Sequence, residues 1–546
     1  MKKNTFLEGA MIATIGIILC KIIGLVYVIP FYAIIGTQGG ALYSYAYSIY
    51  AIFLSLSNSG IPVAVSKVIS EYNTLGYIKA KERAFQMASI VIIGLGIFFF
   101  LVLVIFAPTI ASVILGDIQG GNTLEGVTLV IRVVATALLI VPIESVTQGY
   151  FQGHKIMVPP TMANVIEQLV RVIVIVAGSF VALQVFHLSL ETAVGIAVFG
   201  ATIGCLVAYF YLLRVLKKNK KKIEETALVA SHEPRISRKT ILKKIIYYAL
   251  PFVMIDVMNS AYGMVDTLTV VSGLTDLGYD AVTTETAIGV IATWATKLNM
   301  IVASIALGIT VSLIPNIASS YVKKNWKGVS RKMNQALQAL SLTTIPMAFG
   351  LSFLAAPVWV IFYGYNALSI DIFRLYILQA ITFSFYTTLV NLIQTMNRTK
   401  LGMGILGGSF IAKYLLNVPI MKLCYSIGIP AYYGPIFTTL LTQSVSVLLI
   451  LIIMRKDYQV AYRKTIVLTI KVLLITGVML GILSIMNLFI PVAVQSRWMA
   501  ILITILYAGV GAIIYCVLGY RHHVFQEVFG NDILERILRK FHLKKA

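Results

Sequence analysis

Three lysines lie near the middle of long apolar stretches of the sequence: Lys21, Lys297 and Lys413. A charged side chain at the centre of a membrane helix costs about 2.5–3.5 kcal/mol on insertion scales, so it must face water, a ligand or an opposite charge. None of the three has an acidic residue three or four positions away, so none can be neutralised within its own helix. The lysines therefore predict a water-filled cavity that attracts anions.

The alternative for these lysines is an ion pair with another helix, for which the apolar stretches offer Glu144, Asp256 and Asp266. Glu167 and Arg171 stand four positions apart with the acid first, which is the favourable spacing for an ion pair within one helix. We expect this intrahelical pair to stabilise the fold rather than to bind a substrate.

Two further charges and two prolines occupy informative positions. Arg132 opens an apolar stretch, and Glu144 lies further along the same stretch. These two charges could form a gate or could anchor the helix at the membrane interface, and the sequence favours neither. Pro62 and Pro315 occupy matching positions near the ends of two apolar stretches, and because proline removes a backbone donor, each predicts a break in its helix.

Tyrosines form one more polar feature of the apolar stretches. Tyr43, Tyr47 and Tyr50 are spaced to share one helix face. That face suits either a wet, sugar-compatible wall or a tyrosine belt at the outer membrane interface, and both interpretations stay open.

The composition identifies the elements that must position these residues. Of 546 residues, 59% are hydrophobic and 12% are charged, whereas a soluble protein is nearer half apolar and a quarter charged. A membrane span takes about 20 apolar residues, and fourteen apolar segments can be counted: 9–31, 40–66, 85–107, 126–148, 158–184, 191–213, 246–272, 286–317, 334–362, 370–395, 402–424, 430–453, 466–488 and 498–519. The sequence therefore predicts an all-α integral membrane protein with about 14 transmembrane helices.

The longest polar insert, 214–245, divides the fourteen segments into six, six and two. Prolines and arginines at near-constant offsets in the two groups of six indicate two six-helix lobes related by a pseudo-two-fold repeat. The tail places apolar residues at helical spacing among basic ones, which predicts an amphipathic helix on the membrane surface, with a solvated basic tail as the alternative. The expected domains are lobes at 1–216 and 246–454, a basic linker at 217–245, two additional transmembrane helices at 455–519 and the tail at 520–546.

The charge distribution predicts an orientation. Most of the 44 Lys and Arg residues fall at the N-terminus, in every second connection after it and in the C-terminal tail. The positive-inside rule therefore places both termini in the cytoplasm of a multi-pass cell-membrane protein. The same partition accounts for most of the formal net charge of +23 without nucleic acid, which would need a folded soluble module.

Enzyme motifs are missing from the sequence. It has no GxxxxGK[ST] phosphate loop, no HExxH and no GxSxG, and its four cysteines lack metal-like spacing. The outer connections are too short to build a catalytic domain. We therefore expect no catalytic residues, no metal and no cofactor, which leaves transport without ATP hydrolysis by this chain.

Five segments resemble the polysaccharide-transporter group of the multidrug/oligosaccharidyl-lipid/polysaccharide (MOP) exporter superfamily. They are CKIIGLVYVIPFYAIIG (20–36), ALYSYAYSIYAIFLSLSNSGIPVAVSKVISEYNTLG (41–76), GYFQGHKIMVPP (149–160), VIEQLVRVIVI (165–175) and SLIPNIASSY (312–321). The resemblance covers nearly the whole chain and is closest to the Gram-positive MurJ-type branch, with the stage V sporulation protein B group nearby. It implies a flippase for lipid II, with two six-helix lobes around a cationic cavity and two extra helices forming a lipid-facing groove.

Only some of the basic residues that line the cavity in the family have a match in this sequence. Lys21 matches the basic residue that precedes an x-x-Gly in span one, but Tyr27 and Val28 stand where an Arg-Asp pair is expected. Lys297 matches the basic position of span eight within one residue, and the basic residue near the end of span two is replaced by the stretch 57–62. The resemblance thus implies that Lys21 and Lys297 bind the substrate's anionic group. The remaining cations would come from Arg132, Arg171 or Lys413.

The expected activity is alternating access. The pyrophosphate of a polyprenyl-linked saccharide enters from the inner leaflet, the isoprenoid tail stays among membrane lipids, and rocking of the lobes exposes the headgroup outside. Membrane potential or a coupling ion would drive the cycle, and the cell-wall synthesis machinery is the expected protein partner. The alternatives are export of another polyprenyl-linked oligosaccharide (teichoic acid, capsule or spore cortex), a cation-coupled drug exporter of the same fold, and a non-transporting membrane scaffold of the cell-wall machinery.

The orientation is open to a direct test. A single cysteine placed in the 214–245 insert should react with a membrane-impermeant maleimide only after the cells are opened, because the insert is expected to be cytoplasmic. Labelling of that cysteine in intact cells would contradict the orientation. A second cysteine in a connection expected outside, such as the one at 276–285, serves as the positive control.

Overall fold

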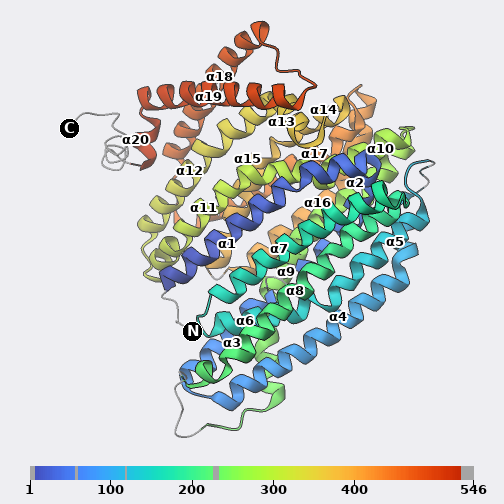
Figure 1. The fold of residues 1–546 in the computed structure, drawn as a ribbon. Coiled ribbons are helices and arrows are strands. Elements are labelled where there is room, and N and C mark those ends of the chain that lie inside the picture. Colours follow the sequence, from blue (N-terminus) through green and yellow to red (C-terminus); the bar gives the residue numbers. More distant parts are fainter. Residues whose placement is uncertain are drawn as a thin grey trace. The chain divides into compact units, whose positions relative to one another are not determined.

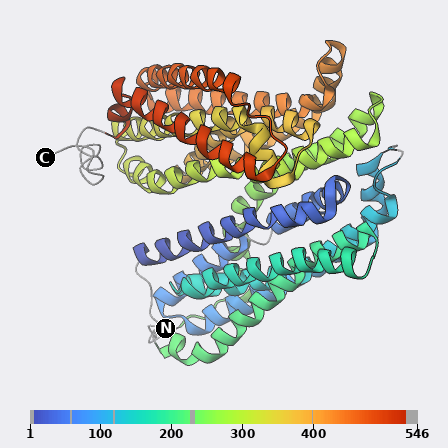
Figure 2. The same ribbon diagram turned by 45° about the horizontal axis from the view of Figure 1, so that its top comes forward.

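The computed structural model describes residues 6–55, 60–116, 118, 120–225, 233–396 and 398–529, and helices account for nearly all of them. No strand is assigned in these ranges. The elements are α1 (Phe6–Val26), α2 (Val28–Ser55), α3 (Ile61–Leu75), α4 (Ile78–Leu115), α5 (Leu124–Ala135), η2 (Thr136–Leu139), α6 (Val141–Gly153), α7 (Val158–Ile173), η3 (Val174–Gly178), η4 (Val181–Val185), α8 (Leu190–Glu225), α9 (Arg238–Asp276), α10 (Ala281–Gly289), η5 (Val290–Trp294), α11 (Ala295–Val322), α12 (Trp326–Phe353), α13 (Ala355–Tyr363), α14 (Ala367–Tyr376), α15 (Gln379–Thr395), α16 (Thr399–Ser426), η6 (Ala431–Tyr433), α17 (Gly434–Tyr458), α18 (Arg463–Phe489), α19 (Arg497–Arg521) and α20 (Val524–Phe529). Within each part of the chain the long helices run roughly side by side (Figures 1 and 2).

The helices confirm a multi-pass, all-α membrane protein. In the described ranges, 11 helical segments are long and apolar enough to cross a membrane, or 12 when one bent pair, Ile15–Val26 and Val28–Ser55, is included. The expected count of fourteen is not confirmed. The sequence pattern places a connection between the expected spans 9–31 and 40–66. In the structure, α2 instead continues through this region with a kink at Gly36, where φ is +66°. Glycine adopts this left-handed backbone without a steric penalty, which lets the helix turn there.

Contacts divide the chain into two compact units, Met1–Ala292 and Thr293–Ala546, within the described ranges. In the first unit, α9 packs against α2, α3 and α4, so the helix that follows the basic insert packs on helices that precede the insert. In the second unit, α12 packs against α11 and α18, and α19 against α13 and α18. The lobe boundaries expected from the sequence remain a prediction.

Much of the basic insert is helical. Helix α8 extends to Glu225, and α9 begins at Arg238, so both membrane helices continue into the polar segment. Between them, Glu233 accepts hydrogen bonds from the backbone nitrogens of Lys79 (3.1 Å) and Ala80 (2.7 Å) in the first turn of α4. A carboxylate at this position satisfies two unpaired backbone donors of a helix start, so it fixes the insert against α4. Of the expected amphipathic tail, the structure describes α20, and residues 530–546 lie outside the described ranges.

Two glycines of the GYFQGH motif explain how α6 packs against α3. A Cβ on Gly149 would lie 2.7 Å from the Pro62 carbonyl oxygen, and a Cβ on Gly153 would lie 2.8 Å from the Ser66 carbonyl oxygen. Both glycines face the same helix because they are four positions apart. Within a membrane, small residues at this spacing let two helix backbones approach closely and gain van der Waals contact.

This packing predicts the effect of adding one methyl group. Gly149→Ala should force α6 away from α3 and destabilise the protein by about 1–3 kcal/mol, the usual cost of overpacking. The measurement is the thermal unfolding temperature of the purified protein in detergent. Gly94→Ala on α4 is the matched control, because a Cβ there has no atom within 4 Å. Equal unfolding temperatures for the two variants would show that the close approach of α6 to α3 does not contribute to stability.

Candidate functional site

The first unit contains a buried carboxyl group held by neutral donors. Glu144 on α6 is 3% exposed. Its Oε2 accepts a hydrogen bond from the Cys205 thiol on α8 (2.7 Å), and its Oε1 accepts one from the Gln148 amide one turn further along α6 (3.0 Å). The same amide donates to Asn164 Oδ1 on α7 (2.8 Å). Three helices therefore meet around this carboxyl group.

The ion pair expected from the i, i+4 spacing lies beside this carboxyl group. Arg171 Nη2 and Glu167 Oε1 are 2.5 Å apart on α7, and their side chains are 16% and 18% exposed. Asn164 precedes Glu167 by one turn, so the Gln148–Asn164 hydrogen bond brings the pair next to Glu144. The three charged groups Glu144, Glu167 and Arg171, which the sequence presented separately, form one polar cluster. We call them, with Gln148, Asn164 and Cys205, the α6–α8 cluster.

Small residues on α8 bring this cluster together. A Cβ on Gly204 would lie 2.7 Å from the Glu167 carbonyl oxygen, and a Cβ on Gly200 would lie 3.1 Å from the Arg171 carbonyl oxygen. The backbone of α7 thus rests directly on α8 at the two residues that form the ion pair. Larger side chains at these positions would separate α7 from Cys205 and break the cluster.

The tyrosine face of α2 adjoins the ion pair. Tyr43 and Tyr47 stack with ring centroids 5.7 Å apart, and Tyr47 and Tyr50 lie 6.2 Å apart edge to face. Together with Arg171 these rings line a small cavity in the first unit. The Tyr50 hydroxyl and Arg171 Nε are buried, and neither has a hydrogen-bond partner in the described part of the chain. Tyr43 and Tyr50 are 3% and 1% exposed, so the face does not form an exposed belt.

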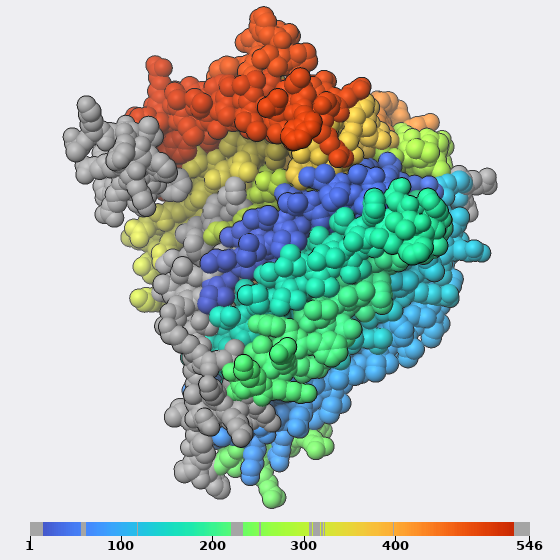
Figure 3. Space-filling view, in the orientation of Figure 1, coloured from blue at the N-terminus to red at the C-terminus, as the bar shows by residue number. Residues whose placement is uncertain are grey.

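The three lysines occupy different environments. Lys21 is half-buried on α1, which lies along α7 in the first unit, as the blue helix of Figure 3 shows. Lys297 is half-buried on α11 and Lys413 is buried on α16 (2% exposed), both in the second unit. Asn417, with no exposed surface, lies one turn beyond Lys413. Burial of this depth is costly for an ammonium group unless polar groups surround it.

The remaining predicted residues are also placed. Arg132 is exposed on α5, and its Nε donates a hydrogen bond to the Val104 carbonyl oxygen on α4 (3.3 Å). Asp256 is half-buried on α9. Pro62 lies in the first turn of α3, beyond the end of α2, whereas α11 is assigned as helix through Pro315.

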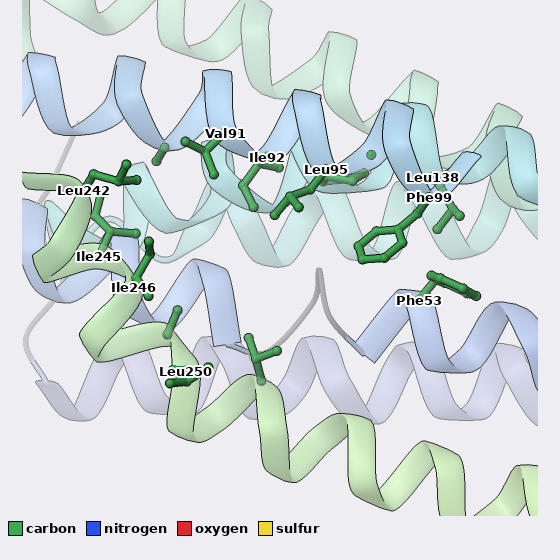
Figure 4. Close-up of a pocket in the computed structure, with 15 residues that line it drawn as sticks. Phe53, Val91, Ile92, Leu95, Phe99, Leu138, Leu242, Ile245, Ile246 and Leu250 are labelled. Carbon is green, nitrogen blue, oxygen red and sulfur yellow. The ribbon is translucent and has the colours of Figure 1, made fainter. Parts of the chain in front are cut away.

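An apolar cavity of about 200 Å³ lies in the first unit, with no charged residue in its lining. Figure 4 shows side chains of α4 and α9 facing each other across it, including Val91, Ile92, Leu95, Phe99, Leu242, Ile245, Ile246 and Leu250. Every residue that lines this cavity is apolar. The cavity therefore suits a hydrocarbon chain and excludes a sugar or a phosphate.

Sequence reasoning missed the neutral members of the α6–α8 cluster. Cys205, Gln148 and Asn164 look like ordinary residues of apolar segments, and only the tertiary packing shows that they surround a carboxyl group. The usable signal is the Gln148 position, four residues after Glu144 on one helix face. In the described ranges, no group of three or more His, Cys, Asp or Glu residues could hold a metal ion.

Long apolar helices with charged residues buried between them define a polytopic membrane protein. Residues 6–321 match the family described as polysaccharide biosynthesis protein. The chain is 31% identical to the lipid II flippase MurJ of Bacillus subtilis (strain 168), over 97% of this chain and 98% of that protein. The chain belongs to this family, as the sequence motifs predicted.

Solved structures support the same fold. A structure of lipid II flippase MurJ superposes with a TM-score of 0.62 at 16% identity, covering 94% of this chain and 99% of that one. A multidrug resistance MATE family transporter of the MOP superfamily superposes with a TM-score of 0.64 at 13% identity, covering 82% and 98%. The fold is therefore that of the MOP superfamily.

The ion pair in the α6–α8 cluster predicts non-additive mutations. Glu167→Gln and Arg171→Gln should each lower the folded yield and the unfolding temperature, because each leaves one partly buried charge alone. The double variant should lose less than the sum of the two single losses. Size-exclusion chromatography and thermal unfolding of the purified variants measure both effects.

An exposed ion pair in the same chain provides the control. Arg374 and Asp371 are 3.4 Å apart, and their side chains are 54% and 50% exposed. Neutralising either partner should change stability by less than about 1 kcal/mol, because solvent screens exposed pairs. Strictly additive losses at Glu167 and Arg171 would show that the buried pair does not act as a unit.

Proposed function

We propose that this protein is a flippase that moves a polyprenyl-diphosphate-linked peptidoglycan precursor, lipid II, from the inner to the outer leaflet of the cell membrane. The observation that carries the proposal is the 31% identity to a lipid II flippase over nearly the full length of both chains. The absence of recognisable enzyme motifs from the sequence fits a transporter that performs no chemistry on its cargo.

The proposed binding groups are lysines in membrane-spanning helices. Lys21 on α1 and Lys297 on α11 would bind the diphosphate through charge-assisted hydrogen bonds, which are shorter and stronger than neutral ones. Lys413 and Arg132 are secondary candidates. Lys413 is buried, whereas Arg132 is exposed and bonded to α4. Arg132 therefore suits a role at the rim better than one in the cavity.

The proposed transport cycle is alternating access between two six-helix lobes, 1–216 and 246–454. The isoprenoid tail would remain in lipid along the helices of 455–519, and both termini would lie in the cytoplasm. In the first lobe, the Cys205–Glu144 and Gln148–Asn164 hydrogen bonds tie α6, α7 and α8 together beside the Glu167–Arg171 pair. We propose that they keep this lobe rigid while it moves, with the membrane potential or a coupling ion as the drive.

A complementation experiment tests the proposal. The protein should restore growth to cells depleted of their only lipid II flippase, and an external toxin that cleaves the lipid II headgroup should then find its target. Lys21→Gln and Lys297→Gln should reduce the cleaved product at least about tenfold, since each removes a charged hydrogen bond of about 1.5–3 kcal/mol. Lys21→Arg and Lys297→Arg should retain more activity than the Gln variants.

The matched control is Lys456→Gln, which removes an exposed lysine at the end of α17. It should leave the cleaved product unchanged at equal protein abundance. If the parent protein complements but both Gln variants do so equally well, the lysines do not bind the substrate. If the parent fails to complement and lipid II stays protected, export of a different polyprenyl-linked saccharide or a scaffold role becomes the better explanation.

A further inference from the structure

The second unit contains a basic pocket whose charged residues have no part in the proposed transport cycle. It has a volume of about 970 Å³ and lies between the start of α12, the 459–462 connection and the start of α18. Four cationic side chains line it: Lys327, Arg331, Arg463 and Lys464. Glu527 of α20, the acidic residue in its lining, is already bonded to Lys471 at 2.5 Å. The pocket therefore carries an excess of positive charge.

None of these four cations makes an ion pair or hydrogen bond with a residue in the described part of the chain. Neutral donors accompany them in the pocket lining: Ser330, Gln335, Gln338 and Gln459. The first turns of α12 and α18 both open here, and the positive ends of these two helix dipoles add to the positive potential. A phosphate group matches this combination of charges and donors.

Hydrogen bonds and aromatic contacts fix the walls of the pocket. Asn334 on α12 donates to the Ala461 carbonyl oxygen (3.1 Å) and accepts a hydrogen bond from Thr465 on α18 (2.5 Å). Trp326 packs on Tyr458 with ring centroids 5.2 Å apart. These contacts hold the connection between α17 and α18 against α12. The walls of the pocket are therefore fixed by tertiary contacts.

The apolar surface next to the pocket indicates what kind of phosphate it takes. Val467 belongs to the pocket lining, and Ile470, Leu474 and Val478 continue from it along α18 at helical spacing. These four side chains are 46%, 51%, 67% and 51% exposed. An exposed apolar stripe on a membrane helix contacts hydrocarbon chains. A molecule with its phosphate in the pocket could therefore lay its chains along α18.

We infer that this pocket binds the phosphate headgroup of an anionic membrane lipid, whose chains run along α18. The pocket belongs to the basic end of α12 and α18, which the charge pattern places at the inner leaflet. Two lipids offer the required chemistry there, a bulk anionic phospholipid and a polyprenyl diphosphate. The inference is independent of the lysines Lys21 and Lys297 and of whether the protein flips lipid II.

Native mass spectrometry of the full-length protein in mild detergent tests the inference. Phosphatidylglycerol, phosphatidylcholine and undecaprenyl diphosphate are added in separate experiments. For each lipid, the fraction of protein that keeps a bound lipid molecule is measured. The parent should retain at least one of the two anionic lipids well above phosphatidylcholine. Each lysine removed from the pocket should weaken that retention about fivefold, since a basic residue near a lipid phosphate contributes on the order of 1 kcal/mol.

The pocket variant is Lys327→Gln with Lys464→Gln, and a second variant, Arg331→Gln with Arg463→Gln, tests the same pocket through its other two cations. The charge-matched control is Lys323→Gln with Lys456→Gln, which removes two exposed lysines of the same unit outside the pocket. All six side chains are exposed, so folding should be preserved, as the elution volume and unfolding temperature will show.

Loss of anionic-lipid retention in both pocket variants, with normal retention in the control, supports the inference. Displacement of phosphatidylglycerol by undecaprenyl diphosphate would identify the pocket as a site for the polyprenyl lipid. If undecaprenyl diphosphate does not displace phosphatidylglycerol, the pocket is a site for bulk phospholipid. Equal retention of phosphatidylcholine by the parent, equal loss in the control, or displacement of the bound lipid by inorganic phosphate alone would overturn the inference. Because binding is measured in detergent, failure here leaves the complementation result unaffected.

Discussion

An ionisable side chain surrounded by hydrocarbon must receive its hydrogen bonds from polar groups of the protein, and the first unit is organised around that requirement. Glu144 obtains one bond from its own helix and one from the Cys205 thiol of α8. Glu167 and Arg171 form an ion pair within α7 through Arg171 Nη2, and Arg171 Nε has no partner in the described part of the chain. Unmet bonds at this depth would cost several kcal/mol each, so the position of one helix constrains the positions of the other two.

Close approach of helix backbones is the means by which these bonds are made. The pairs Gly149–Gly153 on α6 and Gly200–Gly204 on α8 each remove two side chains from one helix face. Lipid chains are as apolar as leucine, so membrane helices gain little from simple hydrophobic burial and depend on contact and hydrogen bonding instead. The glycine pairs provide the contact, and the polar side chains provide the hydrogen bonds.

The sequence predicts features that depend on one helix at a time. Hydropathy predicted the all-α membrane class, and the i, i+4 spacing predicted the Glu167–Arg171 pair, because both follow from local pattern. It did not predict the helical extension of α8 to Glu225, since a charged segment reads as a connection until its backbone is seen.

Features that join several helices were beyond the sequence. The Cys205–Glu144 bond joins residues 61 positions apart. The basic pocket joins the start of α12 to the start of α18 and to Glu527. Neither leaves a local pattern in the sequence, because a single thiol and interfacial lysines and arginines acquire a role only from their neighbours in the fold.

The Cys205 hydrogen bond has a practical consequence for work on this protein. Cysteine-free versions of membrane proteins are a common starting point for spectroscopic labels, and alanine is a frequent replacement. At position 205 alanine would remove a donor from a carboxyl group that is 3% exposed, whereas serine keeps an O–H in its place. Cys516 is exposed and makes no such bond in the described chain, so it tolerates either replacement. A cysteine-free protein with Cys205→Ser should therefore be more stable than one with Cys205→Ala.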